Sequence, residues 1–133
     1  MVRLARALVD SVDRAEEIVQ DAFAHTLRKW NRLDRPGAYL RTAVVNGARS
    51  ELRKREVRRR IKPPARPAST PASDEYLADA LAGLSPKRRI VLVLRFYADT
   101  PDDEIAEILG VRPATVRSLA ARGLSDLREV IER

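Results

Sequence analysis

Arginine and lysine are the residues whose number and spacing could do chemistry in this sequence, and the chemistry they suit is binding to a polyanion. The 133 residues include 26 Lys or Arg and 19 Asp or Glu, which gives a formal net charge of +7. Residues 41–62 alone contain nine basic and two acidic residues, and the rest of the chain is nearly neutral. One basic block on a neutral background indicates a localised polyanion site rather than a uniformly basic coat.

Residue types that build other kinds of site are scarce. With no Cys and one His, the chain lacks the usual ligands of a zinc site, and His25 is expected to be solvated or hydrogen-bonded rather than a ligand. The five glycines do not form a nucleotide-binding loop. Asp102, Asp103 and Glu104 are acidic neighbours, but the helix dipole explains them better than catalysis does. The sequence therefore predicts a protein that is not an enzyme and has no cofactor and no metal.

The same residues predict a cytoplasmic protein. Charges are scattered through the first six residues, unlike a signal peptide, and no apolar run approaches the roughly 18 residues of a membrane span. The absence of Cys fits a reducing compartment.

Residues 103–119 have the pattern of a helix-turn-helix. Ala106 is small where two helices would touch, and Gly110 suits a turn that needs a positive φ. Apolar residues that would fix the angle between the helices are Ile105, Leu109, Val111, Val116 and Leu119. The pattern favours DNA binding, and the alternative is a plain pair of antiparallel helices.

In a helix-turn-helix the start of the second helix enters the major groove of DNA. The outward polar residues there are Arg112, Thr115, Arg117, Ser118 and Arg122. They could bind phosphates or base edges, although a solvated role is equally compatible with each arginine taken singly.

The elements that must position these residues are all helices, because Ala, Leu, Arg and Glu dominate and β-branched alternation is absent. Asp13, Asp74, Ser85 and Thr100 are expected to cap helices, and Pro36 suits a first helical position. Helices are expected over 2–9, from about 14 to 30, from 36 into the arginine run, and over 75–84, 87–97, 102–109 and 113–131.

Residues 62–73 hold four prolines and no large apolar residue, so they predict a linker. The fold class is all-α, with two small helical domains, 1–61 and 74–133.

Apolar periodicity predicts which side of each helix is buried. The first helix would bury Leu4, Ala5, Leu8 and Val9; the second Ala15, Ile18, Val19, Ala22, Phe23, Thr26, Leu27 and Trp30. The third would half-bury one side with Tyr39, Leu40, Ala43, Val44 and Gly47. Residues 87–97 would bury Ile90, Val91, Leu94 and either Phe96 or Tyr97.

Four blocks in this order resemble the bacterial sigma factors of the extracytoplasmic-function type, in the sigma-70 superfamily, and most of all the actinobacterial variety. The blocks are Ala15-Glu-Glu-Ile-Val-Gln-Asp-Ala-Phe23, Tyr39-Leu-Arg-Thr-Ala-Val-Val-Asn46, residues 80–97 and residues 115–128. The resemblance implies a promoter-specificity factor that binds RNA polymerase core and directs initiation of transcription at promoter DNA.

Roles for single residues follow from the same resemblance. Residues 1–61 would be sigma region 2 and dock on the polymerase clamp through Glu16, Glu17, Gln20 and Asp21, although a merely solvated face fits that pattern too. The −10 element would be contacted by Tyr39, Asn46, Arg49, Arg53, Lys54, Arg58 and Arg59, with residues 31–34 adjoining. Tyr39 stands where the family usually has Trp, and it could stack on a base or belong to the core. Residues 74–133 would be sigma region 4, grip the polymerase flap, and read −35 DNA through Arg112, Thr115, Arg117, Ser118 and Arg122.

The chain departs from the family at its N-terminus, where a further helix normally precedes residue 2. The apolar faces of helices 4–9 and 15–30 are therefore expected to lack cover, which would invite self-association or partner binding. An anti-sigma factor is a further candidate partner.

Two other functions fit the residues. One is a stand-alone helix-turn-helix regulator that binds duplex DNA as a dimer. The other is a non-catalytic helical protein that binds polymerase and touches nucleic acid only weakly.

Overall fold

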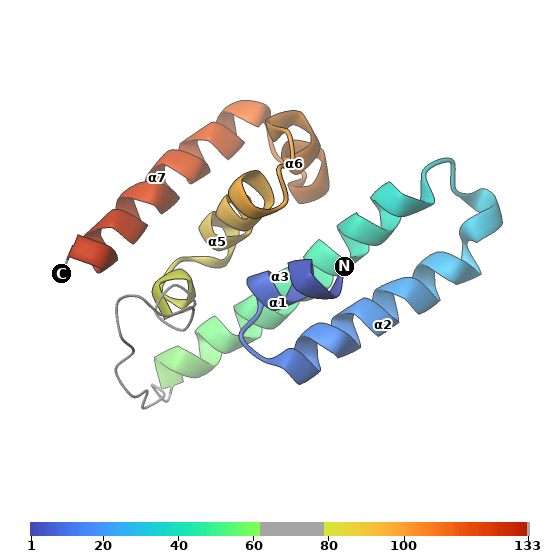
Figure 1. Ribbon diagram of the computed structural model, residues 1–133, viewed down its shortest axis with the longest axis horizontal. Helices are drawn as coiled ribbons and strands as arrows, with labels where there is room; N and C mark the ends of the chain where they lie inside the picture. Colours follow the sequence, from blue (N-terminus) through green and yellow to red (C-terminus); the bar gives the residue numbers. More distant parts are fainter. Residues whose placement is uncertain (62–78, 133) are drawn as a thin grey trace.

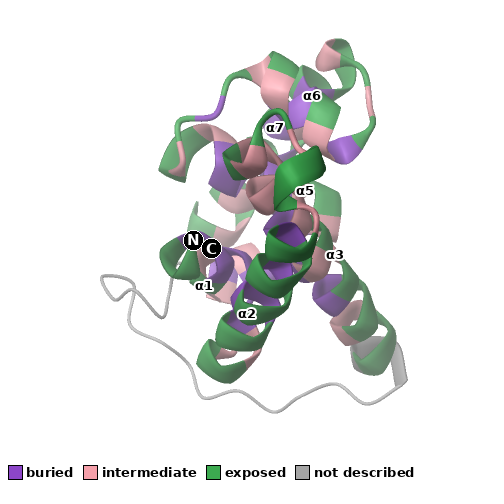
Figure 2. Cartoon of the chain, turned by 90° about the vertical axis from the view of Figure 1, so that its right-hand side faces the viewer, coloured by how far each residue is buried: buried purple, intermediate pink, exposed green. Residues whose placement is uncertain are grey.

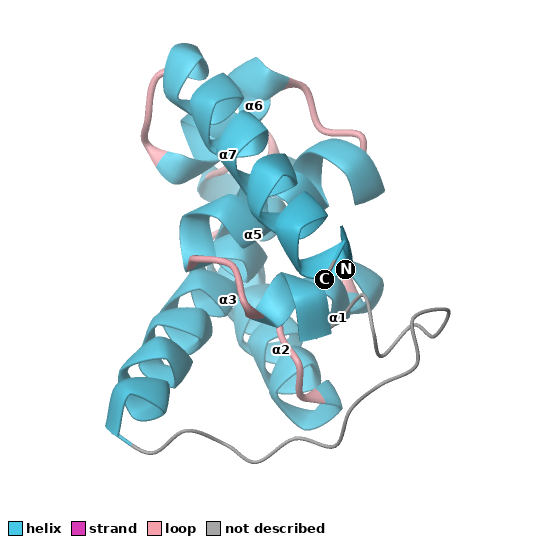
Figure 3. Cartoon of the chain, turned by 90° about the vertical axis from the view of Figure 1, so that its left-hand side faces the viewer, coloured by secondary structure: helices cyan, strands magenta, loops and turns pink. Residues whose placement is uncertain are grey.

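The computed structural model describes residues 1–61 and 79–132, with the side chains of residues 59–61 left out. Over these residues the chain forms helices and loops without a strand (Figure 3), as the composition predicts. The expected linker 62–73, the cap at Asp74 and the start of the helix at 75 lie outside the described residues.

Three helices make the first half of the structure (Figure 1): α1 (Val2–Leu8), α2 (Val12–Arg28) and α3 (Pro36–Ile61). A short 3-10 turn, η1 (Trp30–Arg32), joins α2 to α3. Ser11, rather than the expected Asp13, caps α2, because its hydroxyl accepts the N–H of Arg14 at 3.3 Å. Asp13 lies in the first turn, where the helix dipole favours an acid. Pro36 is the first residue of α3, as expected.

The second half begins with helical residues 79–82 and continues through α5 (Pro86–Leu92), η2 (Val93–Tyr97), α6 (Asp102–Leu109) and α7 (Pro113–Glu132). The expected helix 87–97 is thus two elements, because η2 is a π-helix in which the N–H of Ala98 reaches the carbonyl of Val93 at 3.1 Å. At the end of this wider turn, Phe96 and Tyr97 are 57% and 55% exposed. The prediction that one of them is buried is wrong.

Thr100 does not cap α6 as expected. Pro101 occupies the N-cap position, and Thr100 is buried, with its hydroxyl toward the carbonyl of Ala98 at 3.5 Å. Ser85 is the N-cap of α5 and Pro86 its first residue, but the Ser85 side chain makes no capping hydrogen bond.

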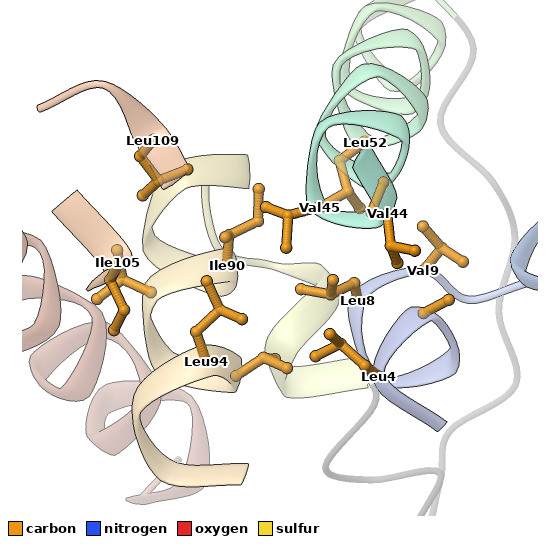
Figure 4. Close-up of a cluster of buried hydrophobic side chains, with 14 of the residues drawn as sticks. Leu4, Leu8, Val9, Val44, Val45, Leu52, Ile90, Leu94, Ile105 and Leu109 are labelled. Carbon is orange, nitrogen blue, oxygen red and sulfur yellow. The ribbon is translucent and has the colours of Figure 1, made fainter. Parts of the chain in front are cut away.

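One hydrophobic core runs through both halves (Figure 4). In the first half it holds Leu8 and Val45, and in the second Ile90 and Leu94, all with no more than a trace of exposure. Helix α5 packs on α3, and η2 packs on α1, so the halves lie directly against each other. The two expected domains therefore share a core in this structure.

Helix α1 is not uncovered, contrary to expectation. Leu4, Ala5, Leu8 and Val9 are all buried, because α1 packs against α2, α3 and also η2 of the second half. Exposed apolar surface lies instead on the last turns of α2 and in η1, at Phe23, Leu27 and Trp30. None of the described helices is long and apolar enough to cross a membrane.

Candidate nucleic-acid interface

The turn between α6 and α7 has the geometry that the helix-turn-helix pattern predicts. Gly110 adopts the left-handed conformation, with φ 68° and ψ 37°. The N–H of Val111 donates to the carbonyl of Ala106 at 3.0 Å, which closes the end of α6 in a Schellman arrangement. Ala106 is buried at the contact, together with Ile105 and Val116. The pair of helices is thereby fixed at a defined angle.

The residues expected to read duplex DNA all lie on the open side of this motif. Arg112, Thr115, Arg117, Ser118 and Arg122 are exposed or partly exposed. Within the described part of the chain, none of their side chains has a hydrogen bond or ion pair. They are available to a ligand without first losing an internal partner, which is what a DNA-reading surface requires.

The basic residues of α3 are not equally available. Asn46, Arg53, Lys54 and Arg58 are exposed or partly exposed, and the Arg59 side chain lies outside the described residues. Asn46 and Arg53 share one line along α3 at a spacing of seven residues, and Lys54 and Arg58 follow another. These lines place the amide of Asn46 and three cationic side chains on the exposed surface of α3, which suits a polyanionic ligand.

Arg49 lies between these residues and is only half-buried, but its Nε atom is buried without a hydrogen-bond partner among the described residues. Burial, with the nearby charge of Arg53, lowers the pKa of Arg49 from its ordinary value. A phosphate oxygen would relieve both effects, because it supplies an acceptor and a negative charge.

Three cations of α3 already have partners. Arg58, although 67% exposed, has its Nη2 3.6 Å from the Oε1 of the buried Glu51. Arg55 donates to Asp10 at 2.5 Å, and Arg41 pairs with Glu104 of α6 at 3.3 Å. Part of the basic block is therefore used inside the molecule, which the sequence count does not reveal.

Tyr39 is neither fully buried nor fully open. Its ring is stacked on His25 with centroids 5.8 Å apart and an interplanar angle of 18°, and the Lys29 Nζ lies 5.8 Å from its centroid. Both partners come from the C-terminal end of α2, so this end holds the ring at the start of α3. His25 is exposed, as expected for a solvated imidazole.

The acidic edge expected to dock on polymerase lies on the outer face of α2, which is largely exposed in Figure 2. Glu16, Glu17, Gln20 and Asp21 are all exposed, and Glu17 pairs with Arg14. Arg14 in turn reaches the buried Glu51 of α3, whose hydrogen bond and charge raise the pKa of Arg14. Arg14 therefore links Glu17 of the acidic edge to Glu51 in the contact between α2 and α3.

An apolar continuation of this edge is the feature that sequence reasoning missed. Phe23, Leu27 and Trp30 are 45%, 64% and 53% exposed, so placing them in the core is wrong. Residues Glu16, Gln20, Phe23 and Leu27 follow one another at spacings of four, three and four, so they form a single line along α2. We call this line the α2 stripe. Apolar periodicity does not reveal the exposure of this line, because the width of the buried arc depends on how far α1 and α3 cover α2.

Comparisons with known proteins match both halves. The family model described as "Sigma-70 region 2" matches residues 1–58, and the one described as "Sigma-70, region 4" matches residues 74–127. The RNA polymerase sigma-E factor of Streptomyces coelicolor is 31% identical over 140 residues, covering 97% of this chain and 78% of that protein. Its namesake from Streptomyces avermitilis is 33% identical over 141 residues, covering 99% and 79%.

A solved structure shares the fold. It is the sigma factor RpoE in complex with the anti-sigma factor NepR from Bartonella quintana, with a TM-score of 0.76 and 24% identity, covering 98% of this chain and 89% of that one. With exposed candidate DNA-binding residues on α7, a basic α3, and relatives matched over nearly the whole chain, the protein belongs to the sigma-70 family, as a promoter-recognising sigma factor of the extracytoplasmic-function type that binds RNA polymerase.

Proposed function

We propose that the two halves divide promoter recognition, with residues 1–61 acting at the −10 element and residues 74–133 reading the −35 element. One observation carries this proposal: candidate DNA-binding side chains lie exposed on two separate helices, α3 and α7, one in each matched region. A regulator that reads duplex DNA through one helix-turn-helix has no need of the second surface.

At the −10 element, Asn46 contacts a base, while Arg49, Arg53, Lys54, Arg58 and Arg59 contact phosphates. Tyr39 stacks on an unpaired base with the part of its ring that His25 and Lys29 leave accessible. Such stacking contributes roughly 1–3 kcal/mol per base. At the −35 element, Arg112, Arg117 and Arg122 bind phosphates or guanine edges, and Thr115 and Ser118 bond to either.

Polymerase docking uses the acidic edge together with the α2 stripe. Glu16, Glu17, Gln20 and Asp21 complement a basic surface on the polymerase clamp, and Phe23 and Leu27 supply apolar area beside them. Exposed apolar residues on a helix are typical of protein interfaces, where they contribute more to affinity than rim charges do. The second half contacts the polymerase flap.

We further propose that the chain acts in the cytoplasm, where RNA polymerase works, and has no catalytic activity of its own. An anti-sigma factor is the regulator that we expect, since the structural neighbour RpoE is in complex with one.

Reconstitution tests the proposal directly. The purified chain and core polymerase are expected to transcribe from a subset of a promoter library, and Arg117→Glu with Arg122→Glu should abolish selection at −35. Charge reversal at Arg28, which is exposed on α2 outside the proposed DNA surfaces, is the control and should leave promoter choice unchanged. Failure to bind core polymerase and to give promoter-dependent transcription would refute the proposal.

A further inference from the structure

Two aromatic rings lie against each other outside the hydrophobic core, where the end of α2 meets the start of α3. His25 comes from α2 and Tyr39 from α3, with ring centroids 5.8 Å apart and planes inclined by 18°. His25 is exposed and Tyr39 is half-buried, and neither belongs to the core, so core packing does not explain why the rings meet. We call His25, Lys29 and Tyr39 the ring platform.

The stack leaves room for a further ring. Flat rings in direct face contact lie about 3.5 Å apart. Because the centroids of these nearly parallel rings are 5.8 Å apart, His25 leaves part of the Tyr39 face uncovered. An unpaired base can therefore stack on Tyr39 while His25 keeps its place.

Lys29 holds the same ring from the same helix. It follows His25 by four residues, so both side chains lie on one line along α2. Its Nζ is 5.8 Å from the Tyr39 centroid, and its side chain is partly buried, which suits a cation held near an aromatic ring. Two side chains of α2 thus restrict the movement of one side chain of α3.

The backbone of Tyr39 is fixed as well. Its N–H donates to the carbonyl of Arg35 at 3.1 Å, in the first turn of α3. Only the side-chain torsions of Tyr39 are then left to be ordered, and ordering a side chain at the moment of binding weakens the affinity. His25 and Lys29 supply this order before any ligand arrives.

The charge around the ring platform indicates the class of ligand. Lys29, Arg32 and Arg35 lie between the two rings in the sequence, where Asp34 is the one acidic residue. Arg32 and Arg35 are exposed. Rings interleaved with cations are typical of sites for single-stranded nucleic acid, in which the cations follow the backbone and the rings stack on bases.

We propose that His25 is a positioning residue of the −10 site, which holds the Tyr39 ring ready for an unpaired base of the promoter. This role does not depend on which base is present, because every base has a flat face. Base identity is left to Asn46. The inference rests on the proposed action of residues 1–61 at the −10 element, and it makes α2 a part of that site as well as a docking helix.

Substitutions at His25 separate its ring from its polar atoms. His25→Ala removes both, His25→Gln keeps polar atoms without a ring, and His25→Phe keeps a ring without polar atoms. The Ala and Gln variants should bind the unpaired −10 strand about three- to tenfold more weakly than the parent, because the Tyr39 ring must then be ordered during binding. The Phe variant should bind within about twofold of the parent.

The probe is promoter DNA selected in the reconstitution, with its −10 segment left unpaired, bound by the chain together with core polymerase. One unpaired base at a time is replaced by 2-aminopurine, whose fluorescence falls when it stacks on an aromatic ring. Quenching at the position that stacks on Tyr39 should decrease in His25→Ala and return in His25→Phe. At the other unpaired positions it should stay parental.

The salt dependence of binding distinguishes positioning from a phosphate contact. His25→Ala should lower the affinity by the same factor at every salt concentration, because no phosphate contact is lost. Arg53→Ala, which removes a proposed phosphate contact, should instead reduce the slope of log K against log salt by about one.

Arg28→Ala is the matched control, at an exposed position three residues along α2 from His25. It should leave the quenching and the affinity at the parental values, and urea unfolding of all His25 variants should have the parental midpoint. Parental binding by His25→Ala, or rescue by His25→Gln but not by His25→Phe, would overturn the inference. If the parental chain with core polymerase does not bind the probe, the proposed −10 role itself is refuted.

Discussion

At the scale of single residues, Gly47 sets how closely α2 and α3 approach each other. A Cβ atom at this position would lie 2.9 Å from the Cγ2 of Ile18, which is closer than real Cβ atoms come. Ile18 and the nearby Val44 are both buried. The sequence predicted that Gly47 lies on the buried side of its helix. It did not indicate that α2 and α3 can approach this closely only because residue 47 has no side chain.

Gly47→Ala should therefore destabilise the chain by roughly 1–3 kcal/mol, because either Ile18 or the α3 backbone must move. Urea unfolding followed by circular dichroism measures the change. Gly37→Ala is the matched control, since Gly37 also lies in α3 but a Cβ atom there would have no neighbour within 4 Å. That variant should be neutral or gain less than about 0.5 kcal/mol, because Gly37 lies in the first turn of α3, where the difference in helix propensity counts less than in the middle of a helix. Equal effects of the two substitutions would show that the α2–α3 approach is not tight.

At the scale of elements, the sequence predicted helices best where a residue with a special backbone marks the boundary. Pro36, Gly110 and Pro113 stand where α3 starts, α6 ends and α7 starts. These predictions were confirmed because φ restriction and left-handed freedom act locally. The π-helix at Val93–Tyr97 carries no such mark, so its effect on Phe96 and Tyr97 was not predictable.

Burial was predicted less well than helix position for a physical reason. Apolar periodicity identifies the side of a helix that faces a neighbour, but the width of the buried arc depends on how many helices cover it. On α2 one side is covered along Ala15, Ile18, Val19 and Ala22, while Phe23 and Leu27 lie beyond that cover. The candidate DNA residues of α7 were easier to identify, because the helix-turn-helix pattern itself defines an outward side.

Because the α2 stripe is exposed, a substitution in it should weaken binding to core polymerase without lowering the stability of the chain. Leu27→Asp should lower affinity for core polymerase by about tenfold or more, because apolar interface anchors commonly contribute about 1–2 kcal/mol or more. Its unfolding free energy should change by no more than about 0.5 kcal/mol, since the side chain is 64% exposed.

The comparison for this variant is Ile18→Asp, on the same helix but 6% exposed, which should instead strongly destabilise the fold. Affinity is measured by titration of labelled chain with core polymerase. A large loss of stability in Leu27→Asp would show that Leu27 is part of the core after all, and unchanged affinity would remove it from the docking surface.

At the scale of the whole molecule, the net charge of +7 overstates what is available to DNA. Arg55 and Arg41 come from the basic block but bind Asp10 and Glu104, so their charge is used in internal contacts. Asp10 and Arg89 are 79 residues apart in the sequence, and no local pattern connects them. Pairings at this separation depend on how the halves pack, which is why the ion pair of Asp10 with Arg89 could not be predicted from composition or spacing.

A shared core also predicts that the halves lose stability together. Leu8 is fully buried, and its helix α1 packs against α2 and α3 of the first half and η2 of the second. Leu8→Ala should cost roughly 2–5 kcal/mol through lost burial and the cavity it leaves. If the halves unfold as one unit, hydrogen exchange of amides in α5 should accelerate along with that of amides in α2 and α3.

The control is Leu124→Ala, at a 47% exposed position of α7, which should leave hydrogen exchange nearly unchanged. Faster exchange confined to the first half would show that the halves unfold separately and that the core between them contributes little to their stability.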